Sequence, residues 1–359
     1  MRDWLAAAEM RESLEISARR IGMIILALLF AAIFLKVSGY PPSAVVRGIF
    51  LSLTRDAAGT VRWATPLILS GLAVCVTYKA EIYNLGVDGQ LYMGAAAATV
   101  VALLLPDADP FLSRVAVFAA AMAAGMLFAL IPALLKVYLD TNEVVSTMLL
   151  NFIAALYVDY LVTGPLRDTS TGANLNASPI IPRNTWLPRI SYLAPSSANV
   201  GFYIALIAAV AIAFMFKKTT LGYEIKIVGA NSRFASYGGI RPQRTTLQVM
   251  GLSGAIAGIV GAVEVSAVQH RLLAGFNPDF GFDGIVVSLL ANHNPAGVVF
   301  SGLFFGALKN GGANMERITD VPSAVTKIVM AIIILTISAR AALPKLRQML
   351  KRSARGDNA

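Results

Sequence analysis

The polar side chains that could do chemistry in this sequence gather in two short strings, 85–89 and 280–284. Both strings read apolar residue, Gly, apolar residue, Asp, Gly, and each opens a long apolar stretch. Asn84 and Gln90 flank the first string, and Asn277 precedes the second. Buried amides and carboxylates cost free energy unless they are hydrogen-bonded. The two strings therefore mark places where polarity enters an apolar interior.

Two roles are open for these residues. Asp at a helix start accepts hydrogen bonds from free N–H groups, so Asp88 and Asp283 could simply cap two helices. The other role is functional, in which interrupted helices reach inward and their polar side chains face a solvated pathway. Gln90 favours the second role. A cap alone would satisfy the helix end, so a second polar side chain just inside the span indicates a further function. The candidate pathway residues are Asn84, Asp88, Gln90, Asn277 and Asp283.

Composition predicts the elements that must position these strings. Hydrophobic residues make up 57% of the 359 residues, and charged residues make up only 14%. A soluble domain carries about 25% charged residues, so water is not the solvent of this chain. The fold class is therefore all-α, a polytopic integral membrane protein. About ten transmembrane helices are expected, at 21–36, 63–78, 89–105, 115–135, 144–162, 199–216, 245–268, 284–291, 296–308 and 321–339.

The distribution of positive charge predicts the topology. More Lys and Arg residues lie on the side of the two termini than on the other side, so the positive-inside rule places both termini in the cytoplasm. One membrane domain, 1–359, then has a cytoplasmic N-terminal segment at 1–20 and an external loop at 164–198. A long cytoplasmic loop follows at 217–244, and the tail at 340–359 is cytoplasmic.

The long cytoplasmic loop contains a predicted short helix. An Asn-Ser pair at 231–232 can cap its start, and a Gly pair at 238–239 can end it. Phe234 and Tyr237 share one face of this helix because they are three residues apart. An exposed aromatic pair of this kind indicates a partner surface. The alternative is that the pair lies against the helix ends of its own chain or against lipid headgroups.

Further polar residues lie at or inside the expected spans. The string 141–151 is a helix start, in which Thr141 or Asn142 can cap and Glu143 suits the helix dipole. Ser146, Thr147 and Asn151 follow inside the span, where packing between helices and lining of a pathway are equally open. Glu264 and Lys327 are expected to pair or to reach the membrane surface. The string 292–295 breaks the helix at its proline, as a turn in preference to a pore-lining filter.

The sequence shows no group of residues that could carry catalysis or bind a cofactor. The single cysteine, Cys75, has no partner for a disulfide, and His270 and His293 do not have metal-ligand spacing. A nucleotide-binding glycine loop is also missing, so the chain is not expected to bind ATP itself. We expect no catalytic residues, no metal and no cofactor.

Three strings resemble those of a known family. Residues 81–90 resemble the N-[IL]-G-x-[ED]-G-Q signature of the nucleoside and simple-sugar permeases of bacterial ABC importers, within the branched-chain amino acid and ribose-type permease superfamily. Residues 141–151 are similar to that family's helix start, and residues 228–240 are similar to its cytoplasmic coupling segment. The resemblance covers roughly 66–339, and it implies that Gly229, Asn231, Phe234, Tyr237 and Gly239 couple the chain to an ATPase.

The resemblance implies a type II importer fold with an inverted repeat, working by alternating access in the bacterial inner membrane. The implied partners are a second, shorter permease, cytoplasmic ATPase subunits that bind and hydrolyse ATP, and an external substrate-binding lipoprotein. The string 293–295 departs from the glycine-rich loop of ribose-type permeases, which favours nucleosides over simple sugars. A stand-alone secondary transporter is the alternative class, and it should show a buried ion or proton site. Its candidate residues are Asp88, Asp283, Glu264 and Lys327.

Overall fold

The computed structural model describes residues 25–169, 176–193 and 197–318, together with Gly22 and scattered positions between 321 and 336. Within these ranges the regular structure is helical, and strand pairing is confined to two isolated bridges. The all-α fold class is therefore confirmed. Contacts divide the chain into two compact units, a larger one of Ala58–Gly306 and a smaller one that comprises the residues up to Ala57 and from Ala307 onward.

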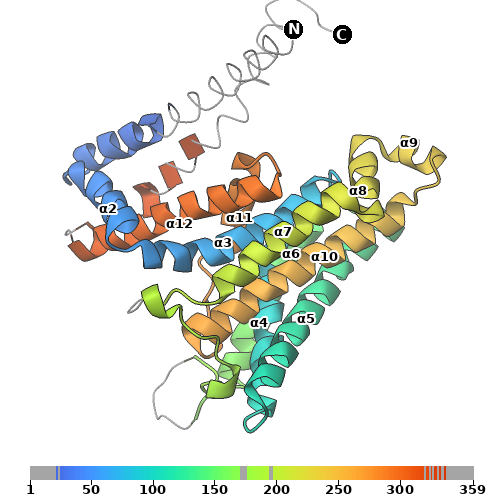
Figure 1. The fold of residues 1–359 in the computed structure, drawn as a ribbon, viewed down its shortest axis with the longest axis horizontal. Helices are drawn as coiled ribbons and strands as arrows, with labels where there is room; N and C mark the ends of the chain where they lie inside the picture. The colour runs from blue at the N-terminus through green and yellow to red at the C-terminus, as the bar shows by residue number, and fades with distance from the viewer. Residues whose placement is uncertain are drawn as a thin grey trace, which may run out of the picture. The chain divides into compact units, whose positions relative to one another are not determined.

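The helices follow one another without an intervening sheet (Figure 1). In chain order they are α2 (Ser43–Thr54), α3 (Ala57–Tyr78), α4 (Val87–Leu104), α5 (Pro110–Leu139), α6 (Glu143–Thr163), the 3-10 turns η1 (Arg183–Thr185) and η2 (Ser191–Leu193), α7 (Gly201–Lys218), α8 (Thr220–Ala230), α9 (Ser232–Tyr237), α10 (Pro242–Val263), the π-helical η3 (Glu264–Gln269), α11 (Phe280–Leu290) and α12 (Pro295–Ile318).

Six helices in the described part of the chain are long and apolar enough to cross a membrane. They are α3, α4, α5, α6, α7 and α10 with η3, and each contains or overlaps one of the expected spans. The first expected span corresponds to a shorter apolar helix, Ile25–Val37, and the eighth corresponds to α11. The ninth lies inside α12, which continues well beyond it. Much of the tenth, with the segments 1–20 and 340–359, lies outside the described residues.

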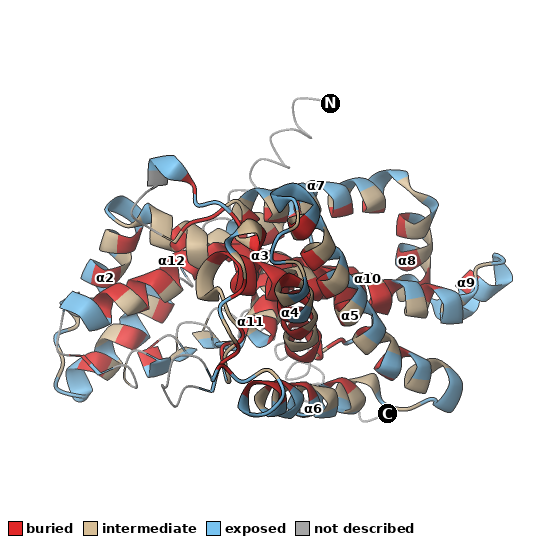
Figure 2. Cartoon of the chain, turned by 90° about the horizontal axis from the view of Figure 1, so that it is seen from below, coloured by how far each residue is buried: buried red, intermediate tan, exposed pale blue. Residues whose placement is uncertain are grey.

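Close packing of α4, α5 and α10 forms the centre of the larger unit. Figure 2 shows buried residues gathered on α3, α4 and α10, whereas α6 is mostly exposed or intermediate. Glycines permit the close approach: a Cβ at Gly258 would lie 2.1 Å from the Ala121 carbonyl oxygen, and one at Gly94 would lie 2.5 Å from the Gly258 Cα. Small residues at helix crossings let backbones touch, which is how helices associate in lipid.

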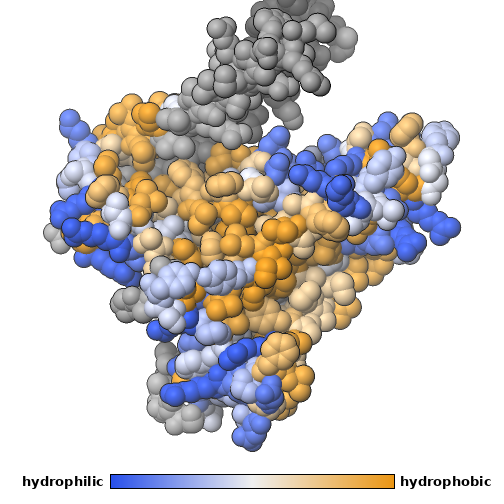
Figure 3. Space-filling model, viewed as in Figure 1, coloured by the Kyte–Doolittle hydropathy of each residue, from blue (hydrophilic) through white to orange (hydrophobic). Residues whose placement is uncertain are grey.

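The surface of the larger unit fits a bilayer. Figure 3 shows hydrophobic side chains over its middle and hydrophilic side chains at its two ends, around α8 and α9 and around the loop between α6 and α7. Exposed large apolar side chains are frequent on α5, α6 and α7. Exposure on this scale would be unfavourable in water, so these faces lie against lipid or another membrane chain.

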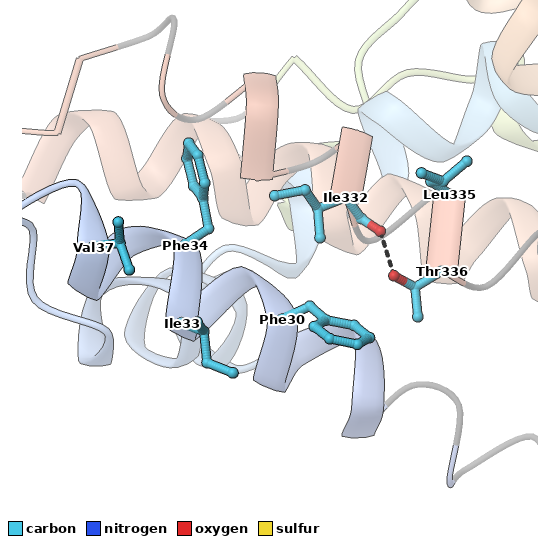
Figure 4. A pocket seen from close by; sticks show the side chains of 7 residues that line it. All are labelled: Phe30, Ile33, Phe34, Val37, Ile332, Leu335 and Thr336. Carbon is cyan, nitrogen blue, oxygen red and sulfur yellow. Dashed lines mark hydrogen bonds between the residues drawn. The ribbon is translucent and has the colours of Figure 1, made fainter.

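The smaller unit packs α2 against the second half of α12. Ser52 donates to the Ala307 carbonyl at 3.0 Å, and Asn310 donates to the Asp56 carbonyl at 2.9 Å. A groove of about 520 Å³ lies beside the helix Ile25–Val37 (Figure 4). Its lining is apolar except for Thr336, whose hydroxyl is already donated to the Ile332 carbonyl at 2.7 Å. The groove is therefore suited to hydrocarbon.

We predict that Gly258→Ala destabilises the protein, because the new Cβ would overlap the α5 backbone and push apart the packed helices. Overpacking of this kind costs about 1–3 kcal/mol. The matched control on the same helix is Gly251→Ala, whose Cβ would meet only side-chain atoms, those of Met126 at 3.3 Å and of Leu130 at 3.7 Å. Melting temperatures in detergent should fall for the first variant and stay near wild type for the second. Equal melting temperatures for both variants would contradict the packing described.

Candidate translocation site

The segment that joins α3 to α4, residues 79–86, begins with a hydrogen-bonded turn at 79–81 and then enters the interior of the larger unit without regular structure. We call it the α3–α4 connection. Its residues alternate in burial, because Ala80, Ile82 and Asn84 are buried whereas Glu81 and Tyr83 are exposed. The connection therefore turns one row of side chains toward the core and the other row outward.

A buried cluster of neutral polar side chains forms where the connection meets α4. The amides of Asn84 and Gln90 exchange two hydrogen bonds, each of 3.1 Å. Asn84 also donates to the Ser253 hydroxyl at 3.0 Å and accepts from the Gly86 N–H at 2.9 Å. All three side chains are at most 1% exposed. Ser253 lies midway along α10, so this amide cluster lies at mid-depth of a helix that spans the membrane.

Side chains from α6 fix the start of α4. The Asn151 amide oxygen accepts from the Gly89 N–H at 2.8 Å, and its nitrogen donates to the Leu85 carbonyl at 2.8 Å. The Thr147 hydroxyl accepts from the Leu85 N–H at 3.3 Å. These groups replace the water that a helix start inside a membrane lacks. Of the two roles left open for Thr147 and Asn151, the structure shows packing between helices.

The two similar strings meet at Asp88. One of its carboxylate oxygens accepts from the Gly281 N–H at 2.7 Å and from the Asn277 amide. Asn277 in turn accepts from the Phe280 N–H at 2.9 Å. Asp88 thus lies in the first turn of α4 and bonds to the first turn of α11, where two partially positive helix ends converge. A carboxylate at this point stabilises both helix ends.

The five predicted site residues fall into three places. Asn84 and Gln90 belong to the amide cluster, and Asp88 and Asn277 bond to each other beside it. Asp283 lies in the first turn of α11 and is partly exposed. The capping role is observed for Asp88, although it acts on α11 and not on its own helix.

Ser253 was not predicted from the sequence. The sequence feature that could have identified Ser253 is weak: it is a hydroxyl in the middle of an otherwise apolar span. Polar residues at membrane depth are usually functional or hydrogen-bonded. It lies among small residues that permit α4 and α10 to approach closely. Only its hydrogen bond to Asn84 distinguishes it from a packing serine.

The short helix predicted within the loop 217–244 is present as α9. Asn231 caps it by accepting from the Phe234 N–H at 3.0 Å, and Gly238 ends it. Phe234 is 64% exposed and Tyr237 is 92% exposed, so the aromatic pair does not lie against its own chain. The preceding helix, α8, was not predicted, since its residues alternate between polar and apolar without a long apolar run.

The expected pairing of Glu264 and the expected turn at 292–295 are confirmed, whereas the expectation for Lys327 stays a prediction. Glu264 pairs with Arg62 at 3.3 Å, and the Arg62 guanidinium lies 4.1 Å from the centre of the Trp63 ring. The string 292–295 is a turn between α11 and α12, in which the Asn294 side chain accepts from the Ala296 N–H at 3.0 Å.

His293 lies in this turn, and its pKa is lowered to about 4, mainly by burial and to a smaller extent by the nearby positive charge of Lys79. The imidazole is therefore neutral at physiological pH.

Metal chemistry has no candidate in the described residues, because no group of three or more His, Cys, Asp or Glu side chains is placed to hold an ion. The site is instead an array of amides and a hydroxyl with one carboxylate beside it. Such groups bind uncharged solutes that both donate and accept hydrogen bonds.

Comparison with known proteins gives several similar chains. The guanosine ABC transporter permease protein NupP of Bacillus subtilis is 35% identical over 336 residues, which is 92% of this chain and 95% of NupP. The nucleoside ABC transporter permease protein NupB of Lactococcus lactis is 31% identical, over 88% of this chain and 89% of NupB. The glucose ABC transporter permease protein TsgB13 of Haloferax volcanii is 36% identical, over 76% of this chain and 73% of TsgB13.

A family profile matches across most of the chain as well. Residues 57–338 match the family described as branched-chain amino acid transport system, permease component. The matched range contains the amide cluster, the junction at Asp88 and the exposed helix α9. The chain therefore belongs to this family of transport-system permease components, as a multi-pass membrane protein.

Proposed function

We propose that the chain is the permease subunit of an ATP-driven importer of nucleosides and that it works by alternating access. The observation that carries the proposal is the amide cluster of Asn84, Gln90 and Ser253, which lies buried at mid-depth of the membrane helices. A nucleoside is uncharged and rich in hydrogen-bond donors and acceptors, so it matches a neutral polar site. Similarity to NupP and NupB over nearly the whole chain supports the same substrate class.

The cluster is closed in this conformation. Asn84 and Gln90 bond to each other, and both are buried by their own chain. A solute can therefore replace these bonds only after α4 and α10 separate at this level. Alternating access supplies such a movement, because it exposes a central site to one side of the membrane at a time.

A simple sugar is the second candidate substrate. Sugars also donate and accept hydrogen bonds, and TsgB13 is 36% identical, although over a smaller share of the chain. The alternative of a stand-alone secondary transporter has less support. Glu264 is paired with Arg62, and one carboxylate oxygen of Asp88 accepts from the start of α11, so each side chain has a structural partner, although the second Asp88 oxygen is buried without a hydrogen bond.

The proposed partners follow from the exposed faces and the relatives. The aromatic pair on α9 would dock on a cytoplasmic ATPase subunit, which binds the ATP. Bacillus subtilis has two guanosine permeases among the relatives, NupP at 35% identity and NupQ at 28%, which supports a core of two different permeases. An external substrate-binding lipoprotein would deliver the nucleoside. In this arrangement α8 and α9 and both termini face the cytoplasm of a bacterial cell.

The orientation predicts opposite labelling of two exposed positions. In a Cys75→Ala background, Tyr192→Cys in the loop between α6 and α7 should react with a membrane-impermeant maleimide in intact cells. Tyr237→Cys on α9 should react only after the cells are opened. The wild-type residues are 76% and 92% exposed, so accessibility within the protein does not limit either reaction. Labelling of position 237 in intact cells would reverse the topology.

The docking role of α9 predicts that the double variant Phe234→Ala, Tyr237→Ala loses ATP-dependent uptake. Burying two aromatic side chains contributes a few kcal/mol at about 25 cal/mol per Å², so their loss should weaken ATPase association by at least about tenfold. Co-purification of the ATPase and uptake would both be measured. Tyr192→Ala, an exposed tyrosine on the other side, should change neither. Normal ATPase association by the double variant would assign coupling to another surface.

The substrate role of the amide cluster predicts that Gln90→Ala lowers the affinity for guanosine by about tenfold at matched membrane content, since one of the groups that would hydrogen-bond the solute is removed. Uptake of labelled guanosine would be competed with unlabelled nucleosides and with glucose, and glucose should not compete. The control is Asn142→Ala, which removes the cap of α6 and should affect only stability. If both variants change yield but not affinity, the cluster is structural. Competition by glucose would instead favour a sugar substrate.

A further inference from the structure

The helix α8 touches the α3–α4 connection at one glycine. A Cβ at Gly229 would lie 2.3 Å from the Lys79 carbonyl oxygen and 3.1 Å from the Ala80 Cα. Real Cβ atoms do not approach so closely, and the atoms in the way belong to the backbone. Neither side of this contact can yield by rotating a side chain. A displacement of α8 toward the connection must therefore displace the connection itself.

The far end of the connection is tied to the amide cluster. Asn84 bonds to Gln90 and Ser253, and the next residue, Leu85, is bonded at both its N–H and its carbonyl to α6. Few residues separate these bonds from the contact at Gly229. A residue spans at most about 3.3–3.6 Å even when fully extended, and the turn at 79–81 is held to the end of α3 by backbone hydrogen bonds, so a segment this short absorbs little movement of its cytoplasmic end.

The docking helix α9 is joined to α8 without a linker. Asn231 ends α8 and also caps α9, since its side chain accepts from the Phe234 N–H. Ala235 is buried, which holds α9 against the rest of the chain, while Phe234 and Tyr237 face outward. A force applied to the aromatic pair is therefore delivered to α8 and to Gly229.

We propose that the α3–α4 connection is the element that passes movement of α8 and α9 to the amide cluster, with Gly229 as the positioning residue at its cytoplasmic end. This inference rests on the proposed function and names the route by which ATP-driven movement reaches the substrate site. A displaced connection shifts Asn84, which breaks its bonds to Gln90 and Ser253 and frees three polar groups to bind a solute. The competing account is that the connection is static and that Gly229 serves close packing alone.

The test follows the reactivity of one exposed residue of the connection. Tyr83 is 44% exposed and would be replaced by Cys in a Cys75→Ala background. The permease complex with its ATPase would be reconstituted, and the maleimide reaction rate at position 83 would be measured without nucleotide and with ATP trapped by vanadate. We expect the two rates to differ by about fivefold or more, the lower end of typical coupling between sites. The same variant must retain uptake.

The variant Gly229→Ala then distinguishes a connection that moves with α8 from a static connection in which Gly229 serves packing alone. It should abolish the nucleotide-dependent difference at position 83 and reduce uptake by about tenfold, while the ATPase still co-purifies. Gly238→Ala, whose Cβ would meet nothing closer than 3.4 Å, is the control and should keep both properties. If Gly229→Ala does not fold, the labelling rates at position 83 in the protein that keeps Gly229 still show whether the connection moves.

Two outcomes would overturn the inference. One is an equal labelling rate at position 83 in both nucleotide states, and the other is normal uptake by Gly229→Ala. Failure of the proposed function gives a different result, because the unaltered complex would then show no ATP-dependent uptake of nucleosides. The two failures are therefore distinguishable in the same preparation.

Discussion

The arrangement depends on satisfying the first N–H groups of two helices that begin inside an apolar interior. Lipid offers no hydrogen bonds, so each free N–H must find a partner in the protein. For α4 the partners are side chains of Asn84 and of α6, and for α11 they are Asp88 and Asn277. Because these partners come from distant segments, the helix starts hold α4, α6 and α11 in one relative position.

The same bonds give the site its capacity to change. Each amide in the cluster has a partner in this conformation, and a substrate that donates and accepts hydrogen bonds can take that partner's place. Replacing hydrogen bonds within the cluster by hydrogen bonds to a substrate leaves the number of bonds nearly unchanged, so the free-energy difference between the two arrangements is small. The packed glycine crossings of α4, α5 and α10 behave differently, because their contacts are between backbones and cannot be replaced by a solute. The hydrogen bonds of the cluster are therefore exchangeable, whereas the contacts at the crossings are not.

Much of this could be predicted from the sequence, and the limits have physical causes. The apolar runs gave the long spans, and Asn142, Asn231 and Gly238 marked helix ends through local hydrogen bonding, which depends on neighbours in the chain. The pairing of Asp88 with Gly281 could not be predicted, because their separation in sequence carries no local signal. Ser253 was missed for the same reason. The helix α8 was missed because it lies at the polar end of the unit, where a helix has no long apolar run that hydropathy could detect.

The two similar strings are not equivalent in the folded chain, and the difference bears on mechanism. Asp88 is buried and accepts hydrogen bonds from the start of α11, whereas Asp283 is partly exposed in the first turn of that helix. A repeat that served capping alone would place both carboxylates alike, since each helix start has the same unsatisfied groups. The first string is instead flanked by the amides of Asn84 and Gln90 and by a connection that contacts α8 at Gly229. The amides of the cluster and the connection thus lie beside the first string, and the second string supplies the helix end to which Asp88 is bonded.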